Sequence, residues 1–206
     1  MAPGDSFLPL YDREFAPRLA LRAAGFRIMF AELEAMLDRT NRSEDLLIVE
    51  TGSNWRDDRW AEHGLSTRLF DRFVVFHGGR FITVDINAEM TKKVRANCSP
   101  STEAICMDSV EYLAQLAAEL GTTNVDLLYL DSWDLDLRDP LPSANHHLKE
   151  LKAILSNLAS GSIIGVDDNP ELPDGTRIGK GMHIREFLSG TGRMPIFDGY
   201  QAVWRI

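Results

Sequence analysis

Two kinds of segment alternate along most of the chain. Short apolar runs bounded by polar residues predict buried strands, and apolar residues spaced three or four positions apart predict helices. The predicted strands are Leu46–Glu50, Phe81–Asp85, Glu103–Met107, Val125–Leu130, Ser162–Val166, Met194–Phe197 and Tyr200–Ile206. The predicted helices between them are Thr67–Phe76, Ala88–Asn97, Val110–Leu120, Ala144–Leu158 and Ile184–Leu188. Such alternation predicts right-handed βαβ units, and therefore a Rossmann-like, doubly wound α/β fold with a mostly parallel sheet.

Both ends of the chain depart from this pattern. Apolar residues at helical spacing between Glu14 and Arg39 predict either one or two helices. At the other end, Asp198 and Gly199 separate the last two strands and favour a tight two-residue turn. Parallel neighbours cannot be joined so briefly, so the C-terminal strand is expected to run antiparallel. We expect N-terminal lid helices over residues 1–45, ahead of an α/β domain over residues 46–206.

Composition narrows the class of protein. A chain of 206 residues with 44% hydrophobic residues is long enough for one complete α/β core, and no apolar run approaches the length of a membrane span. A net charge of −9 opposes non-specific binding to nucleic acid. The first residues lack the layout of a secretory signal, and Cys98 and Cys106 are expected to be reduced. We therefore expect a cytoplasmic protein with a small-molecule substrate, either as a monomer or as a homo-oligomer.

Acidic or glycine-containing segments follow four successive predicted strands. They are Glu50-Thr51-Gly52, Asp85, Asp108-Ser109 and Asp131, with Gly64-Leu65-Ser66-Thr67 opening the helix after the first strand. Taken singly, each is more often a turn or a helix cap. Their recurrence at the carboxyl ends of consecutive strands predicts a nucleoside cofactor in the crevice there. NAD is a poor candidate, because the fingerprint G-x-G-x-x-G is absent.

These motifs, together with the closing segment Phe197 to Ile206, resemble the successive motifs of class I S-adenosylmethionine-dependent methyltransferases. The resemblance covers about residues 46–206. It implies that Glu50 and Gly52 flank the methionine part of the cofactor, Asp85 the ribose, and Asp108 with Ser109 the adenine. The full set of expected cofactor-binding residues is Glu50, Thr51, Gly52, Ser66, Thr67, Asp85, Ile86, Asp108 and Ser109.

The segment Ser53–His63 is longer than the corresponding loop of that family. Two tryptophans within it, Trp55 and Trp60, are expected either to fold over the cofactor or to pin an exposed loop by their own packing. Both alternatives stay open on the sequence.

Carboxylates also end two neighbouring strands in a way that favours a cation. Leu130-Asp131-Ser132-Trp133 and Gly161 to Asp168 resemble the metal-dependent O-methyltransferases of the catechol and macrocin (sugar) types. Asp131, Asp167 and Asp168 would then be metal ligands, although a shift of one position would substitute the pair Asp168 and Asn169. Three oxygen donors suit Mg²⁺, with Mn²⁺ or Ca²⁺ as alternatives. The ordinary alternative is a polar turn after the strand, enforced by Pro170.

The expected reaction is methyl transfer from S-adenosylmethionine to a hydroxyl of a sugar or another polyhydroxylated molecule, assisted by the metal. Asp134 is the candidate general base, and His146 and His147 are further catalytic candidates. The glycine-rich segment around Arg177 and Lys180 could close over an anionic substrate, although an ordinary mobile connection is the simpler expectation. Two rivals remain, a metal-independent methyltransferase of the same fold and a non-catalytic domain that binds the cofactor.

Overall fold

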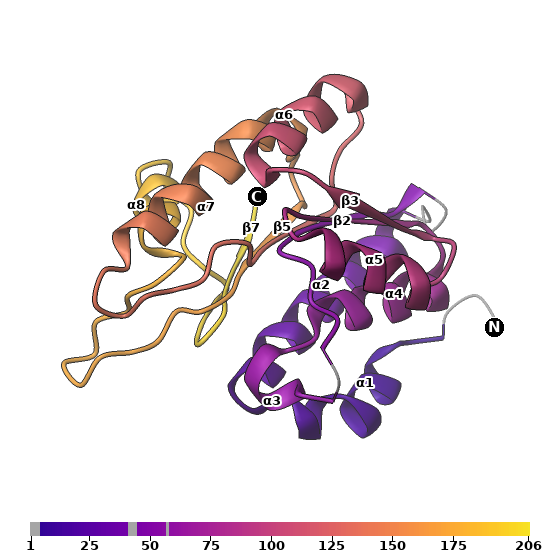
Figure 1. The fold of residues 1–206 in the computed structure, drawn as a ribbon, viewed down its shortest axis with the longest axis horizontal. Helices are drawn as coiled ribbons and strands as arrows, with labels where there is room; N and C mark the ends of the chain where they lie inside the picture. The colour runs from indigo at the N-terminus through magenta and orange to yellow at the C-terminus, as the bar shows by residue number, and fades with distance from the viewer. Residues whose placement is uncertain (1–4, 41–44, 57) are drawn as a thin grey trace.

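A single mixed sheet organises the chain. The computed structural model describes residues 5–40, 45–56 and 58–206, and this part contains a seven-stranded sheet in the order β3-β2-β1-β4-β5-β7-β6 (Figure 1). The strands are β1 (Leu47–Thr51), β2 (Arg80–Asp85), β3 (Thr102–Cys106), β4 (Leu127–Leu130), β5 (Ile163–Val166), β6 (Phe197–Asp198) and β7 (Ala202–Arg205). The first five are parallel, while β7 runs antiparallel to both β5 and β6. The predicted Rossmann-like sheet with an antiparallel C-terminal strand is confirmed.

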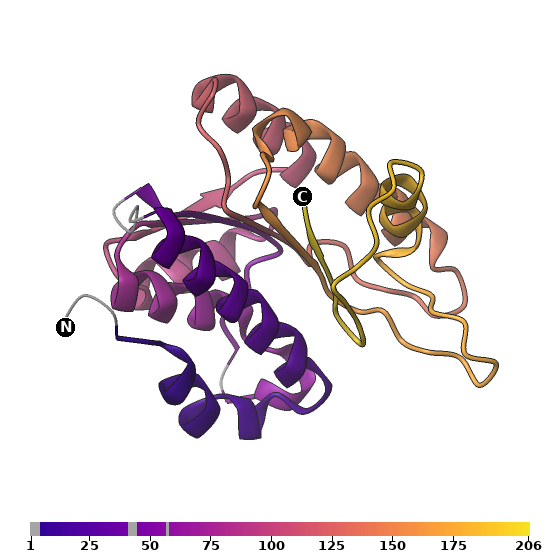
Figure 2. The same ribbon diagram turned by 180° about the vertical axis from the view of Figure 1, so that it is seen from behind.

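Helices cover both faces of the sheet, with α6, α7 and α8 on one side and α1, α2 and α4 on the other (Figures 1 and 2). The α-helices are α1 (Leu8–Glu14), α2 (Ala23–Thr40), α3 (Trp60–His63), α4 (Ser66–His77), α5 (Ala88–Asn97), α6 (Ser109–Leu120), α7 (Leu141–Ile154) and α8 (Met182–Ser189). Short 3₁₀ helices are η1 (Ala16–Arg18), η2 (Ala20–Arg22) and η4 (Leu155–Asn157).

Successive side chains of a strand point to opposite faces of the sheet, so each strand contacts helices on both faces. Leu47 and Val49 of β1 pack into the cluster with α6 and α7, whereas Ile48 between them packs into the cluster with α2 and α4. Phe26 and Phe30 of α2 lie in that second cluster, against Phe70 and Phe73 of α4. The helices ahead of residue 45 therefore share a hydrophobic core with the sheet. The proposed division at residue 45 stays a prediction, and residues 1–4 and 41–44 lie outside the described part.

Two local expectations need correction. The last turn is not the two residues Asp198 and Gly199, because Asp198 still pairs with Ala202 in the ladder and Gly199 donates its N–H to the carbonyl of Gln201. The strand before it is also shorter than expected, since β6 begins only at Phe197. At the N-terminus the structure decides between the two alternatives left open, because one long helix, α2, runs unbroken from Ala23 to Thr40.

Gly25 has a packing reason to be glycine. A Cβ added there would lie 2.2 Å from Oε1 and 2.9 Å from Cβ of Gln201, whose side chain is fully buried. We expect Gly25→Ala to lower the free energy of unfolding by about 1–3 kcal/mol, the usual cost of overpacking a core. Urea unfolding measures the loss. Gly190→Ala is the matched control, since its added Cβ meets no atom closer than 3.4 Å; equal stabilities for the two variants would contradict this explanation.

Among the described residues, no helix combines the length and the apolar character needed to cross a membrane.

Candidate functional site

The sheet has a switch point between β1 and β4. The chain winds outward from β1 to β2 and β3 on one side, and from β4 to β5 on the other. Ligands of open α/β sheets bind beyond the carboxyl ends of the strands at such a point. Gly52, directly after β1, lies at this place with a φ of +82°, and an added Cβ would come within 2.3 Å of the carbonyl oxygen of Asp131. The absence of a side chain at Gly52 therefore lets the ends of β1 and β4 approach each other.

A first cavity of about 120 Å³ opens on one side of this point. Its lining consists of Gly52, Val84, Asp85, Ile86, Asp108, Ser109, Ser132, Trp133 and His146. Asp85 ends β2 and accepts a hydrogen bond of 2.7 Å from the N–H of Asn87. Asp108 caps α6 by accepting from the N–H of Glu111 at 3.0 Å. The expected ribose and adenine residues are thus gathered around one hollow, although Asp108 also has the capping role that is common for this position.

A second cavity of about 190 Å³ continues from the first, and the two share Gly52, Asp85 and Ser132. Its polar lining comes from residues widely separated in sequence. They are Arg22, Gly52, Ser53, Asn54, Arg56, Glu62, His63, Asp85, Asp131, Ser132, Asp134, Asp168, Lys180 and Tyr200. Burial, followed by the charges of Arg56 and Arg59, lowers the pKa of His63, so its imidazole is neutral at neutral pH. The second cavity is the polar continuation of the first.

Three carboxylates converge beside this second cavity. Asp131 follows β4, and Asp167 and Asp168 follow β5; one oxygen of each lies within 4.8 Å of the others. Asp168 has a φ of +50°, which is unusual for a residue with a side chain. The predicted convergence of the three aspartates is therefore present, while binding of a metal to them stays a prediction.

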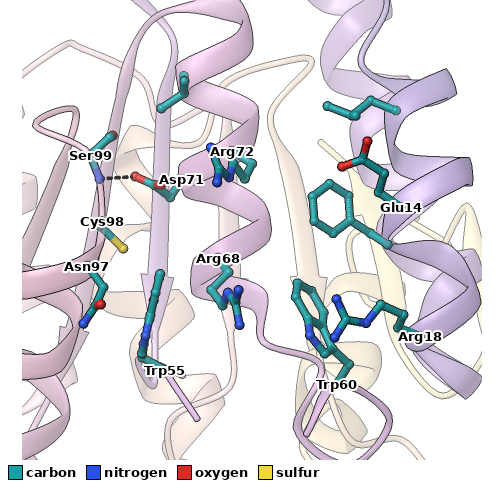
Figure 3. Close-up of a pocket in the computed structure, with 13 residues that line it drawn as sticks. Glu14, Arg18, Trp55, Trp60, Arg68, Asp71, Arg72, Asn97, Cys98 and Ser99 are labelled. Atoms are coloured by element: carbon teal, nitrogen blue, oxygen red, sulfur yellow. Dashed lines mark hydrogen bonds between the residues drawn. The ribbon is translucent and has the colours of Figure 1, made fainter. Parts of the chain in front are cut away.

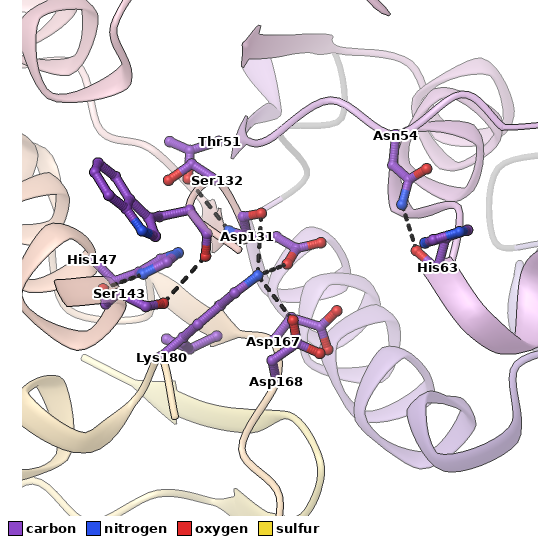
Figure 4. Close-up of polar contacts among 12 residues, drawn as sticks. Thr51, Asn54, His63, Asp131, Ser132, Ser143, His147, Asp167, Asp168 and Lys180 are labelled. Atoms are coloured by element: carbon purple, nitrogen blue, oxygen red, sulfur yellow. Dashed lines mark hydrogen bonds and ion pairs between the residues drawn. The ribbon is translucent and has the colours of Figure 1, made fainter. Parts of the chain in front are cut away.

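Two cationic side chains already lie among these aspartates. The Lys180 ammonium contacts Oδ1 of Asp131 and lies 3.0 Å from Oδ2 of Asp168 (Figure 4). Arg22 donates to Asp167 at 2.7 Å and to Asp168 at 2.9 Å. Tyr200 donates its hydroxyl to Asp168 at 2.7 Å. The expectation of a mobile basic connection at Lys180 is wrong, because its side chain is only 2% exposed and fully engaged.

The electrostatics of the cluster follow from burial and from these partners. Burial raises the pKa of Asp131 and of Asp167, although Lys180 and Arg22 act in the opposite direction. For Asp168 burial also acts upward, but Lys180 and Arg22 outweigh it and the pKa is lowered. Burial alone would lower the pKa of Lys180, whereas the adjacent Asp131 and Asp168 raise it above its ordinary value. Lys180 therefore keeps its positive charge at neutral pH.

Four of the expected cofactor-binding residues lie behind the cavities. Glu50, Thr51, Ser66 and Thr67 are buried and line neither hollow. Glu50 accepts hydrogen bonds of 2.6 Å from the hydroxyls of both Thr67 and Thr83. These side chains tie β1, β2 and α4 together beneath the site, and direct cofactor contact by them stays a prediction.

Glu50 gives a test of this buried network. Burial raises its pKa to about 7, against the opposing hydrogen bonds from hydroxyls. The folded state therefore holds a proton that the unfolded chain releases near pH 4.5, so stability is lost as the pH rises through about 7. We expect Glu50→Gln to be more stable relative to wild type at pH 8 than at pH 5, by up to about 3 kcal/mol at 1.4 kcal/mol per pKa unit. Denaturant unfolding across this range checks it; a difference independent of pH would contradict it.

The three catalytic candidates occupy different environments. Asp134 lines the second cavity, and in the described part of the chain it has no hydrogen bond or ion pair. His146 lines the first cavity, where its Nε2 lies 3.0 Å from the Ser109 hydroxyl. His147 is fully buried and lines neither; its Nδ1 contacts the Ser143 carbonyl at 2.7 Å, and burial lowers its pKa to about 4. Only Asp134 and His146 are placed to meet a ligand.

The two tryptophans pack away from these cavities. Trp55 and Trp60 line a separate hollow of about 650 Å³ between the N-terminal helices and α4 (Figure 3). The guanidinium of Arg68 lies 5.1 Å from the Trp55 ring and 4.9 Å from the Trp60 ring, and that of Arg18 lies 4.6 Å from the Trp60 ring. Of the two alternatives for the long loop, pinning by its own aromatic residues fits this arrangement. Asp57 of the same loop lies outside the described residues.

Comparison with known proteins bears on the fold. No family model matches the chain, and no curated protein matches its sequence. Among solved structures it is similar to the MycE methyltransferase from the mycinamycin biosynthetic pathway in complex with Mg and SAH, with a TM-score of 0.61 and 15% identity over 98% of this chain and 55% of that one. A complex of MycE that also holds mycinamycin VI matches with a TM-score of 0.51 and 16% identity, over 80% and 39% of the two chains.

These similarities define the class of fold. At such identities they show that the chain has the α/β fold of S-adenosylmethionine-dependent methyltransferases such as MycE. The chain spans about half the length of MycE. The calicheamicin methyltransferase CalS11 also matches, with a TM-score of 0.49 and 18% identity over 100% of this chain and 98% of that one.

Proposed function

We propose that this protein transfers a methyl group from S-adenosylmethionine to a hydroxyl of a small molecule, with a sugar or another polyhydroxylated compound as the acceptor. The observation that carries the proposal is the pair of joined cavities at the switch point of the sheet. One is bounded by acidic and apolar side chains suited to a nucleoside, and the other is polar and suited to an acceptor. The similarity to the MycE complex that holds Mg, SAH and mycinamycin VI supports the same assignment of class.

The first cavity has features that a nucleoside would satisfy. Asp85 offers a carboxylate at the end of the second strand, where a ribose diol is commonly bound. Ile86 and Trp133 line this cavity and are 76% and 52% exposed. Large exposed apolar side chains around a hollow are typical of a ligand site, because a bound ring covers them. We infer that the adenosine part lies here, between the carboxylate of Asp85 and these apolar side chains.

The residues that line the second cavity are the ones we expect to act on the acceptor. Bound S-adenosylmethionine supplies a methyl group that is already activated by a positively charged sulfur. Asp134 accepts the proton of the acceptor hydroxyl, and the carboxylates of Asp131 and Asp168 accept hydrogen bonds from neighbouring hydroxyls of the same acceptor. Holding the two reactants in line contributes most of the acceleration.

The predicted metal site meets a specific obstacle. The aspartates offer three oxygen donors, and Oδ1 of Asp167 is buried without a hydrogen-bond partner, which favours a cation there. However, Lys180 lies between Asp131 and Asp168, and Arg22 holds Asp167. A divalent ion bound by all three aspartates would have to displace a buried lysine, so the arrangement of side chains does not fit it. Metal-assisted transfer therefore remains the second candidate form of the reaction.

Two measurements test the proposed function. Calorimetric titration with S-adenosylmethionine establishes cofactor binding, and a screen of hydroxylated acceptors with a radiolabelled methyl donor establishes transfer. We expect binding at a single site and label in at least one sugar-like acceptor. Binding without transfer to any acceptor would favour the non-catalytic cofactor-binding domain, and no binding would overturn the proposal.

A further inference from the structure

We propose that the ammonium group of Lys180 is the resident cation of the acidic cluster, in place of a divalent metal ion, and that the reaction of this protein needs no divalent metal. The cluster consists of Asp131, Asp167 and Asp168. The part of this proposal that concerns turnover without a metal rests on the proposed methyl transfer. The occupancy of the cluster by Lys180, in contrast, is measured without any turnover.

The contacts of Lys180 use its full capacity. An ammonium group has three donors and no acceptor. Here they meet Oδ1 of Asp131, the carbonyl oxygen of Asp131 at 3.3 Å and Oδ2 of Asp168 at 3.0 Å. The ammonium therefore bridges the carboxylates that follow two adjacent strands, as a bound metal ion would. Lys180 acts as a positioning residue, because it holds these oxygens and has no donor left for a substrate.

The backbone around Lys180 is fitted to this placement. Gly179 has a φ of +115°, and an added Cβ would lie 2.0 Å from the carbonyl oxygen of Asp168. At Gly181 an added Cβ would lie 2.3 Å from Oδ1 of Asn169, which accepts the N–H of Gly181 at 2.9 Å. Lys180 donates its own N–H to the carbonyl of Asp168 at 3.2 Å. Two glycines thus allow the loop to lie directly on the segment that carries the aspartates, and the lysine enters from a fixed backbone.

The charges of the cluster are nearly balanced without a metal. Lys180 and Arg22 offset two of the three carboxylates, and Tyr200 donates a hydrogen bond to Asp168. A divalent ion would lie next to the ammonium and be repelled by it. Displacing the lysine would also cost free energy, because the buried carboxylates would lose their cationic partner. We conclude that Lys180 and a divalent ion exclude each other at this cluster.

The test is the binding of Mn²⁺ alone, measured by the electron paramagnetic resonance signal of the free ion, in the wild-type protein and in Lys180→Ala. Removing the ammonium leaves three oxygens within 4.8 Å of one another and no cation between Asp131 and Asp168. We expect no binding at the cluster in wild type and a new site in the variant, so that the apparent affinity of the protein for Mn²⁺ rises by about tenfold or more. A structural role alone would not create a metal site. Lys149→Ala, a change of an exposed lysine on α7, is the matched control and should behave as wild type.

Each outcome decides the proposal. Mn²⁺ bound by wild type and released by Asp167→Asn would overturn it, and so would a folded Lys180→Ala that gains no site. If thermal unfolding shows that Lys180→Ala does not fold, the wild-type titration decides alone. Methyl transfer by the wild type that survives exhaustive chelation supports the consequence for turnover. Failure to bind S-adenosylmethionine would instead overturn the proposed function, and would leave the result for the cluster standing.

Discussion

Asp134→Asn is expected to lower kcat of methyl transfer by about 10²- to 10⁴-fold, the usual contribution of a positioned general base. Asp134 lines the polar cavity and, in the part of the chain that the structure describes, has no partner that would hold its carboxylate away from a substrate. Asparagine keeps the shape but cannot take the proton. Affinity for S-adenosylmethionine is expected to stay close to wild type, because this carboxylate does not line the nucleoside cavity. Steady-state transfer of a labelled methyl group, combined with calorimetry, separates the two effects.

The control for this variant lies two residues away. Asp136 is exposed, lines neither of the joined cavities, and accepts a hydrogen bond from the N–H of Arg138 at 2.9 Å. Asp136→Asn should therefore retain kcat within about threefold of wild type. If Asp134→Asn behaved in the same way while His63→Gln lost activity, the base would be His63, the neutral imidazole at the same cavity.

Asp85→Ala is expected to weaken binding of S-adenosylmethionine by about 10- to 150-fold, equivalent to the 1.5–3 kcal/mol of a hydrogen bond to a charged group. Asp85 is the acidic side chain at the end of β2 and lines both cavities. Burial raises the pKa of this carboxylate somewhat, and a diol that donates to it would stabilise its charged form. Equilibrium dialysis with labelled cofactor measures the loss of affinity.

Glu103→Ala is the matched control for Asp85→Ala. Glu103 is an exposed carboxylate on the neighbouring strand β3, 3.6 Å from Arg80, and it lines neither of the joined cavities. It should leave cofactor affinity unchanged. Thermal unfolding of both variants is needed, because Asp85 also accepts the N–H of Asn87. Equal affinities of wild type and a folded Asp85→Ala for S-adenosylmethionine would contradict the assignment of the ribose to this position.

The sequence could predict the strand ends because their pattern is local. Continuous apolar runs such as Leu127–Leu130, followed at once by a carboxylate, mark both the buried strand and the place where it ends. Parallel pairing then brings Asp85, Asp131 and Asp167 to one edge, whatever the details of packing. Helix ends were less predictable, because α7 begins at Leu141, three residues before the first expected position.

The cations of the site could not be predicted in the same way. Arg22 reaches Asp167 across 145 positions of sequence, and Lys180 reaches Asp131 across 49. Neither contact has a spacing rule, since each depends on how a helix or a loop packs against the sheet. A partial signal was present in the pattern Gly179-Lys180-Gly181, because two glycines around a charged residue allow close backbone approach. Charge balance among three neighbouring aspartates also called for nearby cations.

Calorimetric titration of the unmodified protein with S-adenosylmethionine, in the absence of added metal, is the decisive experiment for the proposed methyltransferase site. We expect saturable binding of one cofactor per chain, unaffected by a chelator, because the nucleoside cavity and Lys180 are both supplied by the chain itself. The absence of any binding by the folded protein would contradict it.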